Sequence, residues 1–151
     1  MYAWKVAPAL ITGNSVIVKP AELTSLSAYR LTQLAYEAGV PKAALQLVCG
    51  LGEEVGAALG QHMDVDMVSF TGSTEVGRLF LQYSAQSNLK EVVLECGGKS
   101  PQIVFADAII NEQTIEHILS AAFWNMSENC SCGSRLLVHS SQKEALLTLL
   151  K

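Results

Sequence analysis

Short apolar runs alternate with helical patterns along the chain, and this alternation restricts the fold more than any other feature. Four runs have the length of buried strands: residues 15–18, 45–48, 67–70 and 92–94. Three amphipathic stretches lie between them: residues 26–38, 53–62 and 74–84. Strands that alternate with helices are typical of parallel sheets joined by crossover helices. The sequence therefore predicts an α/β fold with a doubly wound parallel sheet.

A further α/β pattern begins after Gly97. Its expected elements are a strand at 102–105, a helix at 115–124, a strand at 135–139 and a final helix from 141. We place a domain boundary here, so that residues 1–96 form one domain and residues 97–151 belong to a second. No repeat or linker-like composition separates the two parts, and we expect them to pack closely.

Charge and hydropathy narrow the classes of partner. The chain has 10 Lys and Arg against 14 Asp and Glu, a formal net charge of −4, and its basic residues are scattered. This pattern argues against a nucleic acid or an anionic membrane surface as partner. No apolar run reaches the roughly 18 residues of a membrane span, and the first residues do not resemble a secretion signal. We expect a cytoplasmic protein with a small-molecule partner.

The cysteines do not resemble a disulfide framework or a metal site. Cys49, Cys96, Cys130 and Cys132 are irregularly spaced in a sequence rich in helix and strand patterns, which favours reduced thiols. Only one residue separates Cys130 from Cys132, and no His or further Cys lies nearby with the spacing of a zinc site. We predict no metal.

Two segments carry groups with catalytic chemistry. EVVLECGGKSP at 91–101 contains Glu95, and NMSENCSCGSR at 125–135 contains Cys130. A cysteine is a strong nucleophile once it is deprotonated, and a glutamate can act as general base on the water that discharges a covalent intermediate. Small residues beside both groups leave them accessible. The pair therefore indicates covalent catalysis.

These two segments resemble those of NAD(P)-dependent aldehyde dehydrogenases. ECGGKSP is similar to the family's Glu-Leu-Gly-Gly-Lys segment, and ENCSCGSR to its active-site cysteine segment. Upstream, WKVAPALITGNSVIVKPAE and VSFTGSTEVGR are similar to the cofactor-binding stretches, in the family's order. The resemblance covers nearly all of the chain. It implies part of a Rossmann-like NAD-binding domain followed by the start of an α/β catalytic domain, within a longer, homo-oligomeric parent enzyme.

The resemblance also assigns cofactor contacts. Lys19 and Glu22 match residues that hold the adenosine ribose, Gly72 and Ser73 the pyrophosphate turn, and Val76 the adenine side. Further contacts are implied at Gly52, Gly56, Phe70, Cys96 and Gly97. A carboxylate at Glu22 suits two ribose hydroxyls and repels a ribose phosphate, which predicts NAD, with NADP possible. Taken alone, Lys19 and Glu22 could be a solvated strand end and helix start, and Ser73 a plain N-cap.

The implied reaction is oxidation of an aldehyde to a carboxylic acid. Cys130 attacks the carbonyl to form a thiohemiacetal, hydride leaves to the nicotinamide, and Glu95 activates the water that hydrolyses the thioester. Cys132 is expected to be structural. Ser127 and Glu128 replace the family's usual Gly-Gln, and we hypothesise that the carboxylate of Glu128 favours cationic aldehydes.

Two other functions remain open at this point. A cysteine hydrolase or acyltransferase would need a histidine partner for Cys130, and only His117 and His139 lie in the same region of the sequence. Alternatively, the chain is a truncated, non-catalytic nucleotide-binding fragment, because both of its ends run apolar without the usual stop signals. Ester hydrolysis that depends on either histidine would favour the first alternative, and concentration-dependent aggregation of the pure chain would favour the second.

Overall fold

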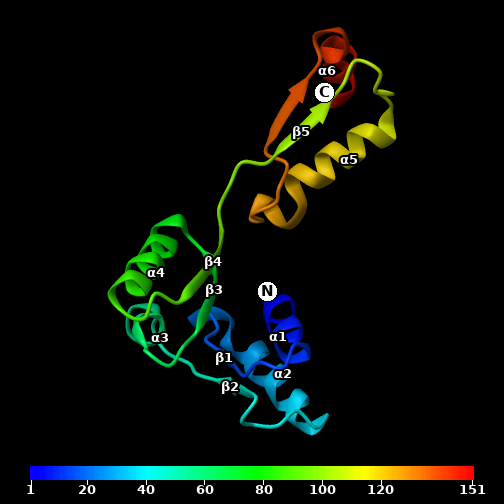
Figure 1. Cartoon of the computed structure of the whole chain (residues 1–151). Helices are drawn as coiled ribbons and strands as arrows, with labels where there is room; N and C mark the ends of the chain where they lie inside the picture. The colour runs from blue at the N-terminus through cyan, green and yellow to red at the C-terminus, as the bar shows by residue number, and fades with distance from the viewer. The chain divides into compact units, whose positions relative to one another are not determined.

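The computed structural model describes all 151 residues, and they divide into two compact units, residues 1–95 and 96–151 (Figure 1). The elements of the first are α1 (Tyr2–Ile11), β1 (Val16–Val18), α2 (Ser25–Glu37), β2 (Leu45–Leu47), α3 (Ala57–Gln61), β3 (Met67–Gly72), α4 (Thr74–Gln86) and β4 (Glu91–Cys96). The predicted alternation of strands and helices is confirmed.

The strands of the first unit pair in twos. β1 lies parallel to β2, with Val16 opposite Leu45 and Val18 opposite Leu47, and β3 pairs with β4. The α/β class with parallel strands is confirmed. The strands of this unit form two separate two-stranded ladders, whereas one continuous sheet was predicted. β1 and β2 have only three residues each, so the ladder between them offers few hydrogen bonds. Leu45 is fully buried between the helices and strands of this unit.

Local signals in the sequence fix the helix ends. The Ser73 hydroxyl accepts a hydrogen bond from the Val76 N–H at 3.2 Å and thereby caps α4. Gly39 follows α2 with a φ of +99°, a conformation that favours glycine and ends the helix. The predicted helix over 53–62 is shorter than expected, because a π-helical turn, η2 (Gly52–Gly56), occupies the stretch before α3.

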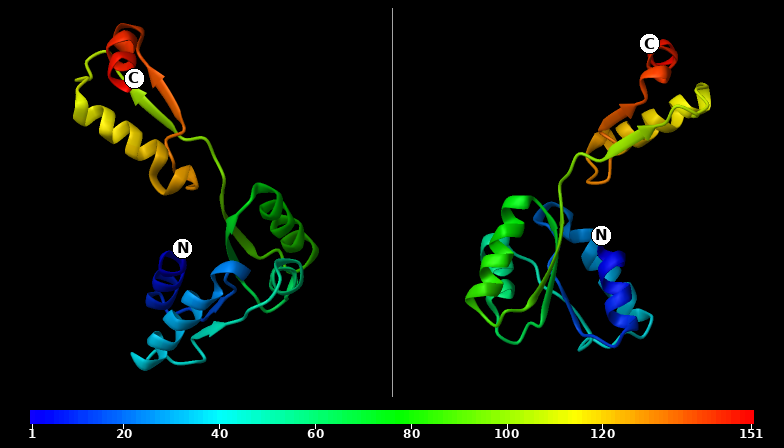
Figure 2. Two further views of the ribbon diagram at one scale, coloured as in Figure 1. Left: turned by 180° about the vertical axis from the view of Figure 1, so that it is seen from behind. Right: turned by 45° about the horizontal axis from the view of Figure 1, so that its top comes forward.

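The second unit is a small β–α–β arrangement (Figure 2). Its elements are β5 (Pro101–Val104), α5 (Glu112–Phe123), the short turn η3 (Trp124–Ser127), β6 (Arg135–Val138), a 3-10 turn η4 (Ser140–Gln142) and α6 (Lys143–Leu150). β5 and β6 are parallel, with Ile103 opposite Leu137. The core consists of Val104, Ile115, Ile118 and Leu146.

The packing places α5 and α6 over one face of the β5–β6 pair. Val104 is buried on that face, whereas its neighbour Ile103 and the opposing Leu137 are 57% and 50% exposed. Successive strand residues point to opposite faces, so the two exposures mark the uncovered side of the pair. None of the helices is long and apolar enough to span a bilayer.

Candidate active site

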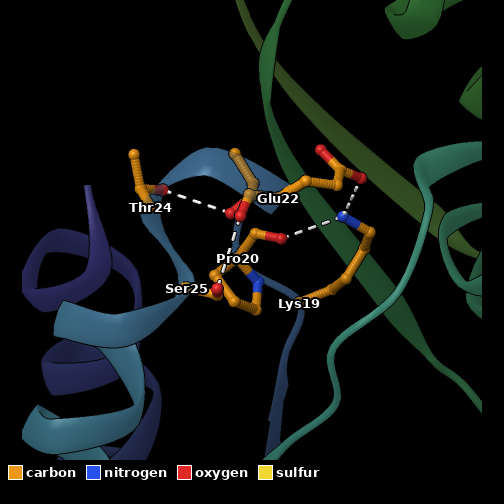
Figure 3. A network of polar contacts seen from close by, with 6 residues as sticks. Lys19, Pro20, Glu22, Thr24 and Ser25 are labelled. Carbon is orange, nitrogen blue, oxygen red and sulfur yellow. Dashed lines mark hydrogen bonds and ion pairs between the residues drawn. The ribbon is translucent and has the colours of Figure 1, made fainter.

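Four of the predicted cofactor residues come together beside the end of β1. The Lys19 ammonium donates to Glu22 Oε1 at 3.0 Å and to the Pro20 carbonyl at 2.9 Å (Figure 3). A Cβ added at Gly52 would lie 3.9 Å from Glu22 Oε1, and one at Gly56 would lie 4.0 Å from Lys19 Cδ. These glycines leave room for the backbone of η2 to approach the Lys19–Glu22 pair.

The electrostatics of this pair favour an ionised carboxylate. The pKa of Glu22 lies below its ordinary value, because its own backbone N–H and the Lys19 ammonium both stabilise the charged form. The Lys19 side chain is only 15% exposed, whereas that of Glu22 is 46% exposed. The Glu22 carboxylate is therefore held in place by Lys19, and it is exposed enough to accept further hydrogen bonds from hydroxyl groups.

The second predicted set lies at the junction of β3 and α4. The Phe70 ring packs against Phe80 with centroids 4.9 Å apart and lies directly beside Gly72, so that a side chain at position 72 would require the ring to move. Ser73 forms the N-cap of α4, and Val76 is partly exposed one turn later. A Cβ added at Gly56 would lie 3.9 Å from Phe80 Cζ, so the Phe80 ring lies between the two predicted sets. The free N–H groups at the start of α4 suit a phosphate anion.

Glu95 lies at the end of β4, and its charged neighbour is Lys5 on α1. The Lys5 ammonium donates to Ser69 Oγ on β3 at 2.7 Å. Burial lowers the pKa of Lys5, and the charge of Glu95 partly offsets this by raising it. No ion pair joins the two side chains, and Glu95 is solvent-exposed. Sequence reasoning did not find Ser69, since its partner Lys5 is 64 positions away and no motif marks the contact.

Cys130 lies in the loop of residues 124–134 between α5 and β6, here called the cysteine loop. Its thiol is exposed, and its Sγ is 3.8 Å from Asn129 Oδ1. A Cβ added at Gly98 would lie 3.9 Å from the Cys130 carbonyl oxygen, so Gly98 lies beside the cysteine loop. Gly97 has open space around it, and Cys96 is partly buried. The accessible thiol can therefore act as a nucleophile.

Cys132 differs from Cys130 in its surroundings. Its side chain is buried, and its thiol lies 3.4 Å from the Ala122 carbonyl oxygen at the end of α5. This agrees with the structural role expected from the sequence. Cys132 therefore does not compete with Cys130 as an exposed thiol.

No histidine accompanies the thiol of Cys130. The His139 ring shares a hydrogen bond of 2.8 Å with Ser141 in its own turn, and His117 is exposed on α5. Neither ring makes a hydrogen bond to Cys130. Nowhere do three His, Cys, Asp or Glu side chains gather as metal ligands would. The arrangement within the second unit therefore does not favour the Cys–His hydrolase alternative.

Comparison with known sequences identifies the same family over the whole length. The model of the aldehyde dehydrogenase family matches residues 1–151. The aminoacetaldehyde dehydrogenase of Pseudomonas aeruginosa is 56% identical over 147 residues, which are 97% of this chain and 30% of that protein. Aldehyde dehydrogenase 1A1 of Equus caballus is 51% identical over 141 residues, 93% of this chain and 28% of that protein.

Solved structures lead to the same family. The aldehyde dehydrogenase KauB of Pseudomonas aeruginosa matches with a TM-score of 0.94 and 50% identity, covering 99% of this chain and 30% of that one. The indole-3-acetaldehyde dehydrogenase AldA of P. syringae, in complex with NAD+, matches with a TM-score of 0.93 and 49% identity over the same shares. The chain thus spans about 30% of the length of these relatives. It belongs to the aldehyde dehydrogenase family, which is NAD(P)-dependent.

Proposed function

We propose that the whole protein containing this chain oxidises an aldehyde to a carboxylic acid with NAD, using Cys130 as nucleophile and Glu95 as general base. The observation that carries the proposal is the exposed thiol of Cys130, in a loop whose sequence resembles the family's active-site segment. The unpaired Glu95 carboxylate supports the second role.

The reaction divides into acylation and hydrolysis. In acylation, the Cys130 thiolate forms a bond to the carbonyl carbon, and the carbonyl oxygen becomes an oxyanion. NAD, when bound, supplies the acceptor for the hydride that leaves this carbon. The product on Cys130 is a thioester. In hydrolysis, Glu95 takes a proton from water, the hydroxide attacks the thioester carbon, and the bond to sulfur breaks to release the acid and the thiolate.

The residues around Lys19 fit the adenosine ribose of this cofactor. An ionised carboxylate accepts hydrogen bonds only, and the partly exposed Glu22 can accept from two neighbouring hydroxyls. A ribose phosphate would meet the same negative charge. Glycines at 52 and 56 leave space beside the pair. These features support NAD as the preferred cofactor, with weaker use of NADP.

The test separates the two chemical roles. Cys130→Ala should abolish aldehyde-dependent NADH formation in the whole protein. Glu95→Gln should leave a burst of NADH equal to one turnover per active site and slow the steady state, because acylation needs no general base on water. If Glu95→Gln reduced the burst and the steady state by the same factor, the base role would be wrong. If Cys130→Ala kept full activity, the whole proposal would be wrong.

A finer proposal concerns the substrate. The carboxylate of Glu128 is exposed two positions before Cys130 and makes no hydrogen bond or ion pair within the chain. The Pseudomonas aeruginosa relative is an aminoacetaldehyde dehydrogenase, and its name refers to an amine-bearing aldehyde. We therefore propose that Glu128 attracts the ammonium group of a cationic aldehyde.

Glu128→Gln tests this preference because it removes the charge and keeps the shape. The ratio of kcat/KM for an amino-aldehyde to that for an uncharged aldehyde of equal length should fall about fivefold, the value of an exposed charge pair of about 1 kcal/mol. The neighbouring Asn129→Ala serves as control for disturbance of the loop. An unchanged ratio in Glu128→Gln would contradict the proposal.

A further inference from the structure

The cysteine loop satisfies the last carbonyl groups of α5. A helix end leaves up to four carbonyls without partners inside the helix, and they must be bonded by other groups. Here the Gly133 N–H donates to the Ala121 carbonyl at 3.0 Å, and the Ser127 hydroxyl donates to the Ala122 carbonyl at 2.7 Å. The Cys132 thiol approaches the same Ala122 oxygen at 3.4 Å. The loop is therefore attached to the helix at both of its ends.

Ser127 makes its contact from an unfavourable backbone conformation. Asn125, Met126 and Ser127 have φ values of +51°, +59° and +62° in succession. Such left-handed conformations are common for glycine and tolerated by asparagine, but they are strained for most other residues. A glycine at 127 would relieve the strain but would have no hydroxyl to donate. The hydrogen bond to Ala122 is thus the feature that serine adds at this position.

Cys130 lies between the two attachment points. The chain leaves the Ala122 oxygen at Ser127, carries the exposed thiol of Cys130, and returns to the same oxygen at Cys132. The Cys130 side chain takes no part in the attachments. Two contacts to one acceptor on a regular helix therefore fix the loop on either side of the reactive group, while the Cys130 thiol contacts only the neighbouring Asn129 Oδ1.

We propose that Ser127 is a positioning residue for Cys130, holding the cysteine loop on the end of α5 so that the thiol meets the aldehyde carbon in a reactive geometry. The inference rests on the proposed function, in which Cys130 is the nucleophile. Displacement of a reacting group by as little as about 1 Å can slow a reaction about a hundredfold, so a loop anchor can control the acylation rate without touching the substrate.

Two substitutions at one position separate the hydroxyl from the backbone. Ser127→Ala removes the hydroxyl and keeps the strain, whereas Ser127→Gly removes both. Ser131→Ala is the matched control, because the Ser131 hydroxyl bonds only within the loop, to the Asn129 amide at 2.9 Å. In the whole protein, the rate of the NADH burst should fall roughly tenfold or more in both Ser127 variants, with KM and the rate of thioester hydrolysis nearly unchanged. Ser131→Ala should keep the burst rate within about twofold.

The outcomes are distinguishable from failure of the proposed function. A burst rate in Ser127→Gly equal to that of the unsubstituted protein, while Cys130→Ala is inactive, would overturn the positioning role and leave the nucleophile in place. Full activity of Cys130→Ala would overturn both. Thermal melting of each variant accompanies the kinetics, and a slowed burst in Ser127→Gly at an unchanged melting temperature would support positioning rather than loss of folding.

Discussion

Gly133→Ala is a sharp test of how the cysteine loop is held against β5. The Gln102 amide on β5 donates to the Ile118 carbonyl at 3.1 Å and to the Gly133 carbonyl at 2.9 Å, and so joins strand, helix and loop. A Cβ at position 133 would lie 2.5 Å from Gln102 Cγ and 2.7 Å from its Cδ and Nε2. All three atoms belong to one side chain. The new methyl group must therefore displace Gln102 from its two acceptors.

The expected cost follows from those two hydrogen bonds. Each contributes about 0.5–1.5 kcal/mol net, so that their loss costs about 1–3 kcal/mol. Replacing glycine by alanine also lowers the conformational entropy of the unfolded chain, which offsets about 0.5 kcal/mol of this cost. In a Gln102→Ala background the obstructing atoms are absent. There, Gly133→Ala should be neutral or slightly stabilising, and the two substitutions should show a coupling energy of about 1–3 kcal/mol.

The assay is urea unfolding of the four proteins of this double-mutant cycle, followed by amide hydrogen exchange of peptides from α5, which reports on the second unit alone. Gly97→Ala is the matched control, since nothing lies within 4 Å of a Cβ added there. An equal cost of Gly133→Ala with and without the Gln102 side chain would refute the reasoning. So would a cost in Gly97→Ala as large as that in Gly133→Ala.

Three further predictions concern the first unit. Ser84→Ala should cost about 1–3 kcal/mol in urea unfolding, because the buried hydroxyl donates to the Lys90 carbonyl at 2.6 Å, while exposed Ser27→Ala should cost less than about 0.5 kcal/mol. Lys19→Met should raise the pKa of Glu22 toward its ordinary value, but only partly because the backbone N–H remains, and NMR titration would show an unchanged pKa if this is wrong. Glu95→Gln should lower the pKa of Lys5 further, since Glu95 raises it, and amine titration by NMR checks the sign.

The lowered pKa of Glu22 also determines the pH range in which its ionised carboxylate stabilises the folded state. A carboxyl whose pKa is lowered by folding stabilises the folded state at every pH above the ordinary pKa of a glutamate. That contribution disappears as the pH falls through the lowered value. Glu22 is therefore ionised throughout the neutral range, and its proposed contact with the cofactor should not change with pH in that range.

Elements with a strong local signal could be predicted from the sequence. The amphipathic stretch at 74–84, preceded by Ser73, became α4 (Thr74–Gln86), because the apolar periodicity and the cap both act within one or two turns. Cys130 and Glu95 were selected for a similar reason, since each lies in a short segment with a distinctive composition, and their catalytic roles stay predictions.

Features that depend on contacts between distant residues could not be predicted. The left-handed conformation of Met126 and Ser127 has no sequence signal, because neither residue favours a positive φ, and it is compensated by the Ala122 carbonyl of a folded helix. Likewise, periodicity places strands but does not determine which of them pair, so the separate β1–β2 and β3–β4 ladders were not foreseen.

Two carboxylates of the first unit have proposed roles, Glu22 in cofactor binding and Glu95 in catalysis, and their contacts with lysine differ. Glu22 accepts a hydrogen bond from Lys19, which restricts its position and would suit the proposed contact with the ribose hydroxyls. Glu95 also has a lysine nearby, but the Lys5 ammonium is bonded to Ser69 and forms no ion pair with it. A carboxylate that must accept a proton from water would lose basicity in a direct ion pair. Because the Lys5 ammonium donates its hydrogen bond to Ser69, its charge acts on Glu95 without a direct contact. The carboxylate oxygens of Glu95 therefore stay available to water.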